Sequence, residues 1–295
     1  MLVYIVGHKG WIGQQFINYF QKNNISYTFS QDGIRAESDE LCNEIKNNIV
    51  THVLCCSGRT HGSIGDKKYT TIDYLQHPET LQQNLNDNLY VPLKLAQFCE
   101  KQSIHFTYIG TGCIYTYQDE KRTFSEEDNP NFFGSNYSIV KGMTNNLIRN
   151  MNCLHLRIRM PITSEKHPRN FITKILNYEK ICSIPNSMSV LDELIPIASH
   201  MMIENIKGTF NFTNPGVIEH NEILQMYKDE VDNCYTWKNF SIEEQDSILL
   251  SKRSNNHLDT SKLESVVINL KEKYPYLIFN NIHNAVISCI KQLNK

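Results

Sequence analysis

The sequence predicts an α/β protein built on a doubly wound parallel sheet. Short apolar segments, each long enough for one strand, alternate along the first 160 or so residues with segments of helical period. A glycine-rich turn follows the first of these strands directly, and the strand at 105–110 ends in a group of polar and reactive side chains. Such alternation favours parallel strands with helices on both faces, and these sheets bind ligands beyond the carboxyl ends of their strands.

The composition excludes several classes of protein. The 295 residues are 40% hydrophobic and 20% charged, an ordinary globular balance that can bury a sizeable core. The net charge of −2 argues against a basic face for nucleic acid. No apolar run reaches the roughly 18 residues that a membrane span needs, so no membrane contact is predicted.

The cysteines and the amino terminus indicate a reduced, cytoplasmic protein. The 9 cysteines are scattered and form no C-x-x-C pair, so neither a disulfide framework nor a metal site is predicted. The adjacent Cys55 and Cys56 would point to opposite faces of a strand as buried small residues. The apolar amino terminus is interrupted at residues 7–10 without a small-residue cleavage site, which argues against a signal peptide.

The first turn predicts a dinucleotide site. Residues 2–6 form an apolar strand candidate, and Phe16, Ile17 and Phe20 mark one face of the helix that follows. Between them the glycines are spaced G-x-x-G-x-x-G, where backbone N–H groups at a helix start can approach a pyrophosphate. An ordinary glycine turn has the same pattern, but its place after the first strand favours the cofactor. The predicted cofactor residues of this turn are Gly7, Lys9, Gly10, Trp11, Ile12 and Gly13.

The ends of the next two strands supply further cofactor candidates. No acidic residue closes the strand at 27–29 to hold an unphosphorylated ribose, whereas Arg35 could meet a 2′-phosphate. This favours NADPH, with NADH as the alternative if Arg35 is only a solvated loop charge. The buried strand at 52–56 ends in a second set of cofactor candidates, namely Ser57, Gly58 and Arg59.

The remaining elements continue the alternation and then change. Up to Pro161 the sequence predicts helices at 37–47, 79–102 and 137–150, strands at 105–110 and 153–160, a flexible rim loop at 62–78 and a solvated acidic turn at 126–130. Beyond it come helices at 171–178, 191–204, 220–231 and 282–293, a short strand and turn at 179–186, a strand at 208–213 and irregular chain between the last two helices. The predicted domains are a cofactor-binding domain over 1–165, with 188–213 returning to it, and a substrate-binding lobe over 166–187 and 214–295.

Four reactive side chains are expected at the end of the strand 105–110. Thr111 and Cys113 follow the strand, and Tyr137 and Lys141 share a helix face because they are four residues apart. An ammonium near the phenol favours its ionised form, so Tyr137 can exchange a proton near neutral pH. Lys141 can also hold the nicotinamide ribose, and Thr111 can hydrogen-bond a carbonyl oxygen where charge develops. Without a substrate, Thr111 would be a strand cap and Cys113 an inert buried thiol.

This arrangement resembles the extended short-chain dehydrogenase/reductase superfamily, which has a Rossmann fold and acts on nucleotide sugars. The 4,6-dehydratases of the superfamily carry Thr-Asp-Glu where this chain has Thr111, Gly112 and Cys113, so the residues for dehydration are missing. A cysteine in this place is similar to GDP-fucose synthase, which epimerises and then reduces a 4-keto sugar. A thiolate suits that work, because a C4 ketone acidifies the protons on C3 and C5.

Blocks along nearly the whole chain resemble the bifunctional UDP-4-keto-6-deoxyglucose 3,5-epimerase/4-reductases of UDP-L-rhamnose synthesis. The stretch 60–86 matches poorly and is longer, which leaves its contribution to specificity open. The matching blocks are GWIG (10–13), TGCIY (111–115), RMPI (159–162), PRNFITKI (168–175), IPNSM (184–188), LDEL (191–194), NFTNPG (211–216), HNEIL (220–224), TWKNF (236–240) and RSNN (253–256).

The resemblance implies roles for individual residues in the conversion of UDP-4-keto-6-deoxy-D-glucose to UDP-β-L-rhamnose. Cys113 and Lys180 match the acid/base pair that epimerises C3 and C5, although Lys180 by its spacing alone would be a surface lysine. The reductase triad is matched by Thr111, Tyr137 and Lys141, and the blocks that hold the nucleotide sugar contain Asn170, Asn186 and Arg253, the last suited to a diphosphate.

Two alternative functions stay open from the sequence. A dTDP-4-dehydrorhamnose reductase would catalyse the reduction alone, but its relatives lack the cysteine at position 113. A non-catalytic regulatory subunit on the same fold, such as the β subunit of methionine adenosyltransferase, need not keep Tyr137 and Lys141, and both are present here. The superfamily also implies a homodimer, while the choice between UDP and dTDP stays open.

Overall fold

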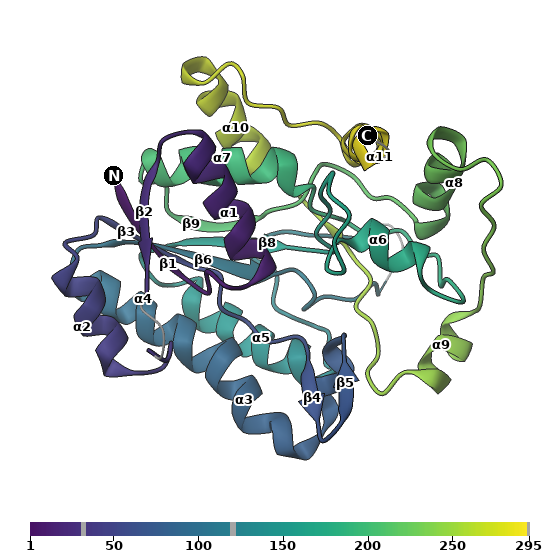
Figure 1. The fold of residues 1–295 in the computed structure, drawn as a ribbon, viewed down its shortest axis with the longest axis horizontal. Coiled ribbons are helices and arrows are strands. Elements are labelled where there is room, and N and C mark those ends of the chain that lie inside the picture. The colour runs from purple at the N-terminus through teal and green to yellow at the C-terminus, as the bar shows by residue number, and fades with distance from the viewer. Residues whose placement is uncertain (31–33, 119–121, 294–295) are drawn as a thin grey trace.

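A six-stranded parallel sheet forms the centre of the molecule (Figure 1). The computed structural model describes residues 1–30, 34–118 and 122–293. The strand order is β2-β1-β3-β6-β8-β9, and every neighbouring pair in it is parallel. The predicted doubly wound sheet is thereby confirmed. Its strands are β1 (Leu2–Val6), β2 (Ser26–Phe29), β3 (His52–Cys55), β6 (His105–Thr111), β8 (Leu154–Ile158) and β9 (Gly208–Asn211).

The strand order reverses between β1 and β3. From β1 the chain crosses to β2 on one side and then returns to β3 on the other side. The turns after β1 and β3 meet at this reversal, because a Cβ built on Gly7 would lie only 2.9 Å from the backbone nitrogen of Ser57. In sheets of this class the crevice at such a switch point is the place where a nucleotide binds.

Helices cover both faces of the sheet, as the alternation predicted (Figure 1). Side chains on one strand alternate between two cores, so Val3 and Ile5 pack on one face and Tyr4 and Val6 on the other. The first core is closed by α1 (Trp11–Lys22), α7 (Leu191–Ile203) and α10 (Ser261–Lys273), and the second by α2 (Asp39–Asn47), α4 (Val91–Lys101) and α5 (Asn136–Ile148).

A third core lies in the carboxyl-terminal part, beyond the sheet. It is built largely from α6 (Phe171–Leu176), α8 (His220–Glu230) and α11 (Ile282–Leu293). The chain leaves the sheet after β8 to form α6, returns for α7 and β9, and leaves it again. This path resembles the expected exchange between two domains, whose boundaries at 165, 187 and 213 stay a prediction. The last two residues of the expected lobe, 294–295, lie outside the described residues.

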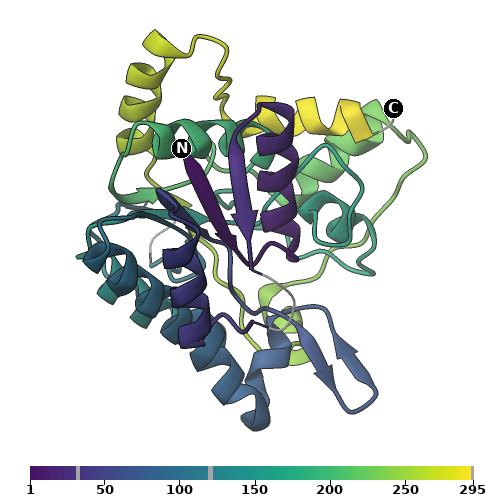
Figure 2. The ribbon, with the colours of Figure 1, turned by 60° about the vertical axis from the view of Figure 1, so that its left-hand side comes forward.

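The rim loop predicted at 62–78 contains regular structure. Two short antiparallel strands, β4 (Gly62–Ile64) and β5 (Lys67–Tyr69), form a hairpin that extends from the body of the molecule in Figure 2. A 3₁₀ helix, η1 (Ile72–Gln76), follows it. The single helix predicted at 79–102 is instead a succession of four helical segments, because a π-helical segment interrupts it: η2 (Pro78–Thr80), α3 (Leu81–Leu85), η3 (Asn86–Tyr90) and α4.

Three further expectations were wrong. The chain predicted to be irregular after α8 contains α9 (Ile242–Ile248), β10 (His257–Leu258, paired with β7, Thr123–Phe124) and α10. The strand predicted at 179–186 is reduced to isolated bridges that Ile181 and Asn186 make to distant segments. Finally, the acidic turn at 126–130 is not wholly solvated, because Glu126 is buried and accepts a hydrogen bond from the Asn211 backbone at 2.8 Å.

No helix within the described parts of the chain is long and apolar enough to cross a membrane.

The docking of α10 gives a stability prediction. Leu263 is fully buried against the first core, so Leu263→Ala should lower the free energy of unfolding by about 2–5 kcal/mol. The matched control is Ile268→Ala on the same helix, where the side chain is 64% exposed and the change should stay within about 0.5 kcal/mol. Urea denaturation followed by circular dichroism measures both, and equal losses would show that α10 is not docked through Leu263.

Candidate active site

The carboxyl end of β6 forms a tight turn that presents Cys113. Every residue of β6 is buried, and Thr111 Oγ1 accepts a hydrogen bond from the backbone nitrogen of Cys113 at 3.1 Å. A Cβ built on Gly112 would lie 2.5 Å from a methyl carbon of Leu258 and 3.0 Å from Arg159 Cγ. Glycine is therefore required here, and the turn is held in one position with the Cys113 side chain half-buried beside it.

Helix α5 brings Tyr137 to the same place. The helix begins at a Ser135 cap, whose side chain accepts a hydrogen bond from the backbone of Ser138 at 3.1 Å, so Tyr137 lies in the first turn. Its phenol lies beside Thr111, which can hydrogen-bond to it, and the ring packs in one cluster with Cys113. Burial and the nearby Cys113 raise the pKa of Tyr137, and the hydrogen bond from Thr111 offsets only part of that rise.

Lys141 lies one turn further along α5, under the cofactor crevice. Its ammonium donates a hydrogen bond to the phenol of Tyr108 and lies 4.8 Å from the centre of that ring. Burial lowers the pKa of Lys141 to about 8. We expected Lys141 to ease ionisation of Tyr137. In the structure its ammonium is hydrogen-bonded to Tyr108 instead, and burial has the largest effect on the pKa of Tyr137. A Cβ on Gly58 would lie 3.9 Å from Lys141 Nζ, which places the ammonium beside the turn after β3.

The glycine turn after β1 fits a dinucleotide. Gly7 has φ +86°, a conformation that favours glycine, and a Cβ on Gly13 would lie 2.5 Å from the Gly7 carbonyl oxygen. Gly10 caps α1 without a side chain, so the helix amino terminus remains accessible to an anion. The side chains of Trp11 and Ile12 pack against the first core, which leaves their backbone groups for cofactor contacts. Lys9, also predicted for the cofactor, is exposed.

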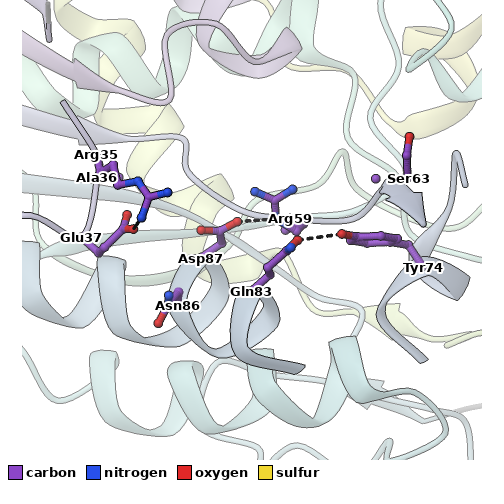
Figure 3. Close-up of a pocket in the computed structure, with 10 residues that line it drawn as sticks. Arg35, Ala36, Glu37, Arg59, Ser63, Tyr74, Gln83, Asn86 and Asp87 are labelled. Carbon is purple, nitrogen blue, oxygen red and sulfur yellow. Dashed lines mark hydrogen bonds and ion pairs between the residues drawn. The ribbon is translucent and has the colours of Figure 1, made fainter. Parts of the chain in front are cut away.

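Two predicted cofactor arginines line one cavity of about 550 Å³ (Figure 3). Arg35 comes from the loop after β2, and its side chain is 80% exposed. Its Nη1 lies 3.6 Å from Glu37 Oε1. Arg59 comes from the chain after β3, pairs with Asp87, and its backbone nitrogen donates to Asn88 Oδ1 at 3.0 Å. Ser57 and Gly58 lead from β3 into the same loop. Two guanidinium groups over one cavity suit a phosphate group.

A buried carboxylate fixes Arg253, a predicted substrate-binding residue. The Arg253 guanidinium donates to Asp73 Oδ2 at 2.7 Å, and Asp73 also accepts from the Ser251 hydroxyl at 2.7 Å and from Thr71 at 2.6 Å. Burial alone would raise the pKa of Asp73, but these hydrogen bonds, led by that of Arg253, bring it down to about 2. Asp73 lies in the 60–86 stretch, whose role the sequence left open.

Sequence reasoning missed two further cations near Arg253. Arg169 lies just before the start of α6, and Lys174 lies in the middle of the helix. Arg169 donates a hydrogen bond to the Thr70 carbonyl at 3.4 Å. Burial, together with the charges of Arg169 and Arg253, lowers the pKa of Lys174 to about 8. Of the three cations, Arg253 is the one that pairs with Asp73 in the described chain, and the remaining positive charge suits a diphosphate. Arg169 and Lys174 both lie in the PRNFITKI block, which could have pointed to them.

The two predicted substrate asparagines are fully buried and hydrogen-bonded within the protein. Asn170 caps α6, with Oδ1 accepting from Ile172 N at 3.1 Å and Nδ2 donating to the Thr163 carbonyl at 2.7 Å. Asn186 accepts from the Asn256 backbone at 3.0 Å. In this structure both shape the loops around the site, and their contact with substrate stays a prediction.

Lys180, the predicted partner of Cys113, is exposed in the loop after α6. Within the described chain, no hydrogen bond or ion pair holds its ammonium. A later part of this loop approaches the reactive turn, because the Tyr117 hydroxyl donates a hydrogen bond to the Pro185 carbonyl at 3.0 Å. The structure thus joins Thr111, Cys113 and Tyr137 at one point, and the pairing of Cys113 with Lys180 stays a prediction.

Metal-ligating side chains do not cluster in the parts of the chain that the structure describes: no group of three His, Cys, Asp or Glu residues could hold an ion.

Comparison with known proteins identifies the family. Residues 3–164 match the model of the NAD dependent epimerase/dehydratase family. The L780 UDP-rhamnose synthase of Acanthamoeba polyphaga mimivirus has a crystal structure that is 43% identical and superimposes with a TM-score of 0.90 over 99% of both chains. A bifunctional dTDP-4-dehydrorhamnose 3,5-epimerase/dTDP-4-dehydrorhamnose reductase of Arabidopsis thaliana is 38% identical over 99% of this chain and 93% of its own.

A more distant structure shows the fold alone. A dTDP-4-dehydrorhamnose reductase from Clostridium acetobutylicum covers both chains completely with a TM-score of 0.76 but is only 16% identical. The closer matches extend over the blocks that the sequence analysis singled out, including the TGCIY turn, and the family resemblance is confirmed. The chain belongs to the NAD dependent epimerase/dehydratase family, and within it to the bifunctional 3,5-epimerase/4-reductases of rhamnose synthesis.

Proposed function

We propose that this enzyme converts UDP-4-keto-6-deoxy-D-glucose to UDP-β-L-rhamnose by 3,5-epimerisation followed by reduction of the C4 ketone with NADPH. The observation that carries the proposal is the meeting of Thr111, Cys113 and Tyr137 at the end of β6. Whole-chain similarity to a UDP-rhamnose synthase and to an epimerase/reductase supports it.

The first reaction exchanges protons beside the ketone. Cys113 Sγ, as thiolate, takes a proton from a carbon next to C4, and the electron pair of that C–H bond moves into an enolate. The enolate oxygen is stabilised by hydrogen bonds from Thr111 and Tyr137. Return of a proton to the opposite side of the carbon inverts it, and the exposed Lys180 is the proposed donor. Proton exchange with solvent returns Cys113 to the thiolate and Lys180 to the ammonium, and repetition at the second carbon then completes the inversion of C3 and C5.

The second reaction uses the same hydrogen bonds from Thr111 and Tyr137 to the carbonyl oxygen. NADPH, when bound in the crevice between β1 and β3, supplies the hydride that C4 accepts. Tyr137 delivers its proton to the oxygen as negative charge develops there, and it is available as the neutral phenol because burial raises its pKa. Thr111 keeps the oxygen in line, and Lys141 is placed to bind the nicotinamide ribose once it turns from Tyr108.

The preference for NADPH over NADH rests on the arginine cavity. A 2′-phosphate between Arg35 and Arg59 would gain charge-assisted hydrogen bonds that NADH cannot make. Family membership supplies the nicotinamide cofactor itself, and the phosphate preference is our proposal. The homodimer and the cytoplasmic location expected from the sequence stay predictions, of which sedimentation velocity tests the first.

The purified protein should convert UDP-linked 4-keto-6-deoxyglucose with NADPH and without a second enzyme, as followed by chromatography. The dTDP-linked sugar and NADH, run in parallel, measure the preferences for base and cofactor. NADPH consumption that depends on an added epimerase would favour the reductase alternative. Absence of turnover with every 4-keto sugar would favour the regulatory-subunit alternative.

Two variants should affect the epimerisation and the reduction to different extents. Cys113→Ala should abolish deuterium incorporation from solvent at C3 and C5, because no other group takes those protons. Tyr137→Phe should slow that exchange without abolishing it, because Thr111 still holds the enolate oxygen, and should lower NADPH oxidation by about 10²–10⁴-fold, the usual contribution of a positioned general acid. Exchange that persists unchanged in Cys113→Ala would show that the thiol is inert filler.

Arg35→Ala should change the cofactor preference. Loss of one charge-assisted hydrogen bond of about 1.5–3 kcal/mol corresponds to roughly a 10- to 100-fold lower kcat/KM for NADPH. The kcat/KM for NADH is the internal control and should change less than twofold. Equal losses with both cofactors would contradict a 2′-phosphate contact.

Binding of UDP should weaken as the pH rises through about 8. Lys174 is charged below its pKa of about 8 and neutral above it, so its attraction for a diphosphate is present at pH 6.5 and lost by pH 9.5. Lys174→Met should bind UDP about tenfold more weakly at pH 6.5 and remove this part of the pH dependence. Calorimetric titration measures both, with Lys101→Met, exposed at the end of α4, as the control.

A further inference from the structure

Arg159 is a buried cation without a carboxylate partner in the described chain. It follows β8, is 1% exposed, and forms no ion pair within the part of the chain that the structure describes. Its two terminal nitrogens donate to backbone carbonyls, those of Ser254 at 2.8 Å and Asn256 at 3.3 Å. These are neutral acceptors, so the guanidinium charge is not neutralised.

The Arg159 side chain lies against the reactive turn. Its Cγ and Cδ lie where a Cβ on Gly112 would clash, at 3.0 and 3.1 Å. Its Nε is buried with no hydrogen-bond partner of ordinary geometry. Burial lowers the pKa of Arg159, and the neighbouring Cys113 is the first group that raises it again, by charge and by side-chain hydrogen bonding. A guanidinium that lacks an anion thus lies beside a thiol.

We propose that Arg159 stabilises the thiolate of Cys113 and thereby prepares it to remove protons from the substrate. A buried unpaired cation is costly, and a thiolate is the anion that its neighbours can supply. The proton released when the thiolate forms goes to solvent, and the thiolate then takes a proton from the carbon next to the ketone, as described above. Arg159 touches no reacting carbon, so it is a positioning residue that acts through Cys113.

The other ionisable groups around Arg159 and Cys113 differ from the guanidinium in their charge or in their bonding. Cys113 also faces Tyr137 and Lys141 from α5. Tyr137 is kept neutral by burial, and Lys141 has a pKa of about 8 and already bonds to Tyr108. Arg159 in turn faces Tyr117, whose hydroxyl donates to a carbonyl, and His220, whose pKa burial and Arg159 lower to about 4. At pH 7 Lys141 is also charged, but it loses that charge as the pH rises through about 8, whereas the guanidinium stays charged next to the thiol.

Alkylation of the folded protein with iodoacetamide tests the proposal without any substrate. The rate at each cysteine is followed by peptide mass spectrometry from pH 5 to 10, because only the thiolate reacts. In the unmodified protein, Cys113 should reach its half-maximal rate at a lower pH than the exposed Cys234. A midpoint equal to or above that of Cys234 would overturn the proposal, whether or not any variant folds.

Variants then assign the effect to the charge. Arg159→Gln should lower the alkylation rate of Cys113 at pH 7 about tenfold and move its profile to higher pH, whereas Arg159→Lys should retain most of the rate. The matched control is Arg157→Gln, which removes the other buried guanidinium of this segment. That guanidinium donates to the Asn145 side chain and to the Glu126 backbone carbonyl, and its loss should leave the profile unchanged. Equal losses in Arg159→Lys and Arg159→Gln, or a shift in Arg157→Gln, would contradict a charge effect.

The catalytic consequence rests on the proposed function and is measured separately. Arg159→Gln should slow solvent deuterium incorporation into the 4-keto sugar at pH 7 and recover at higher pH, with the KM for NADPH unchanged. Because alkylation needs no substrate, a failed turnover assay together with a low-pH alkylation profile would reject only the proposed reaction. A normal exchange rate in Arg159→Gln would reject the role of Arg159 in that reaction.

Discussion

The buried hydrogen bonds of Asn256 hold the whole site together. Its side-chain nitrogen donates to the carbonyls of Gly112 and Tyr115, both at 3.0 Å, and its backbone nitrogen donates to Asn186 at 3.0 Å. The reactive turn after β6 is thus attached to the carboxyl-terminal part of the chain rather than to the sheet alone. Since Asn256 has no exposed surface, water cannot replace these bonds, and the position of Cys113 depends on how that part packs.

This attachment also links the turn to Arg253, a predicted substrate residue. Arg253 precedes Asn256 by three residues, and the Asp73 that orients it lies next to Tyr74, which packs on Tyr137 and Cys113. The 60–86 stretch therefore contacts both Arg253, which we propose to bind the diphosphate, and the residues at the end of β6. A nucleotide sugar held by its phosphates would reach the thiol and the phenol with little freedom to move, which is how binding energy lowers a reaction barrier.

The sheet and the grouping of Thr111, Cys113 and Tyr137 at the end of β6 were predictable because they rest on local patterns. Alternating apolar strands and helices, the glycine turn and the four-residue spacing of Tyr137 and Lys141 are visible without tertiary contacts. The α10 helix was missed although Leu263, Val267 and Leu270 carry its period. The β4–β5 hairpin has no such pattern. The bond from Lys141 to Tyr108 and the charge of Arg159 beside Cys113 depend on neighbours far apart in the chain, which one sequence does not place.

One site can serve both reactions because they share a polarised carbonyl. In the proposed mechanism, hydrogen bonds from Thr111 and Tyr137 to the C4 oxygen stabilise an enolate in the first reaction and the developing alkoxide in the second. Tyr137 must stay protonated to do this, whereas Cys113 must lose its proton, although both lie in one cluster. Burial acts on the phenol, and a buried guanidinium lies beside the thiol. We propose that the two neighbouring acids take opposite protonation states because the unpaired cation lies on the thiol's side of the turn.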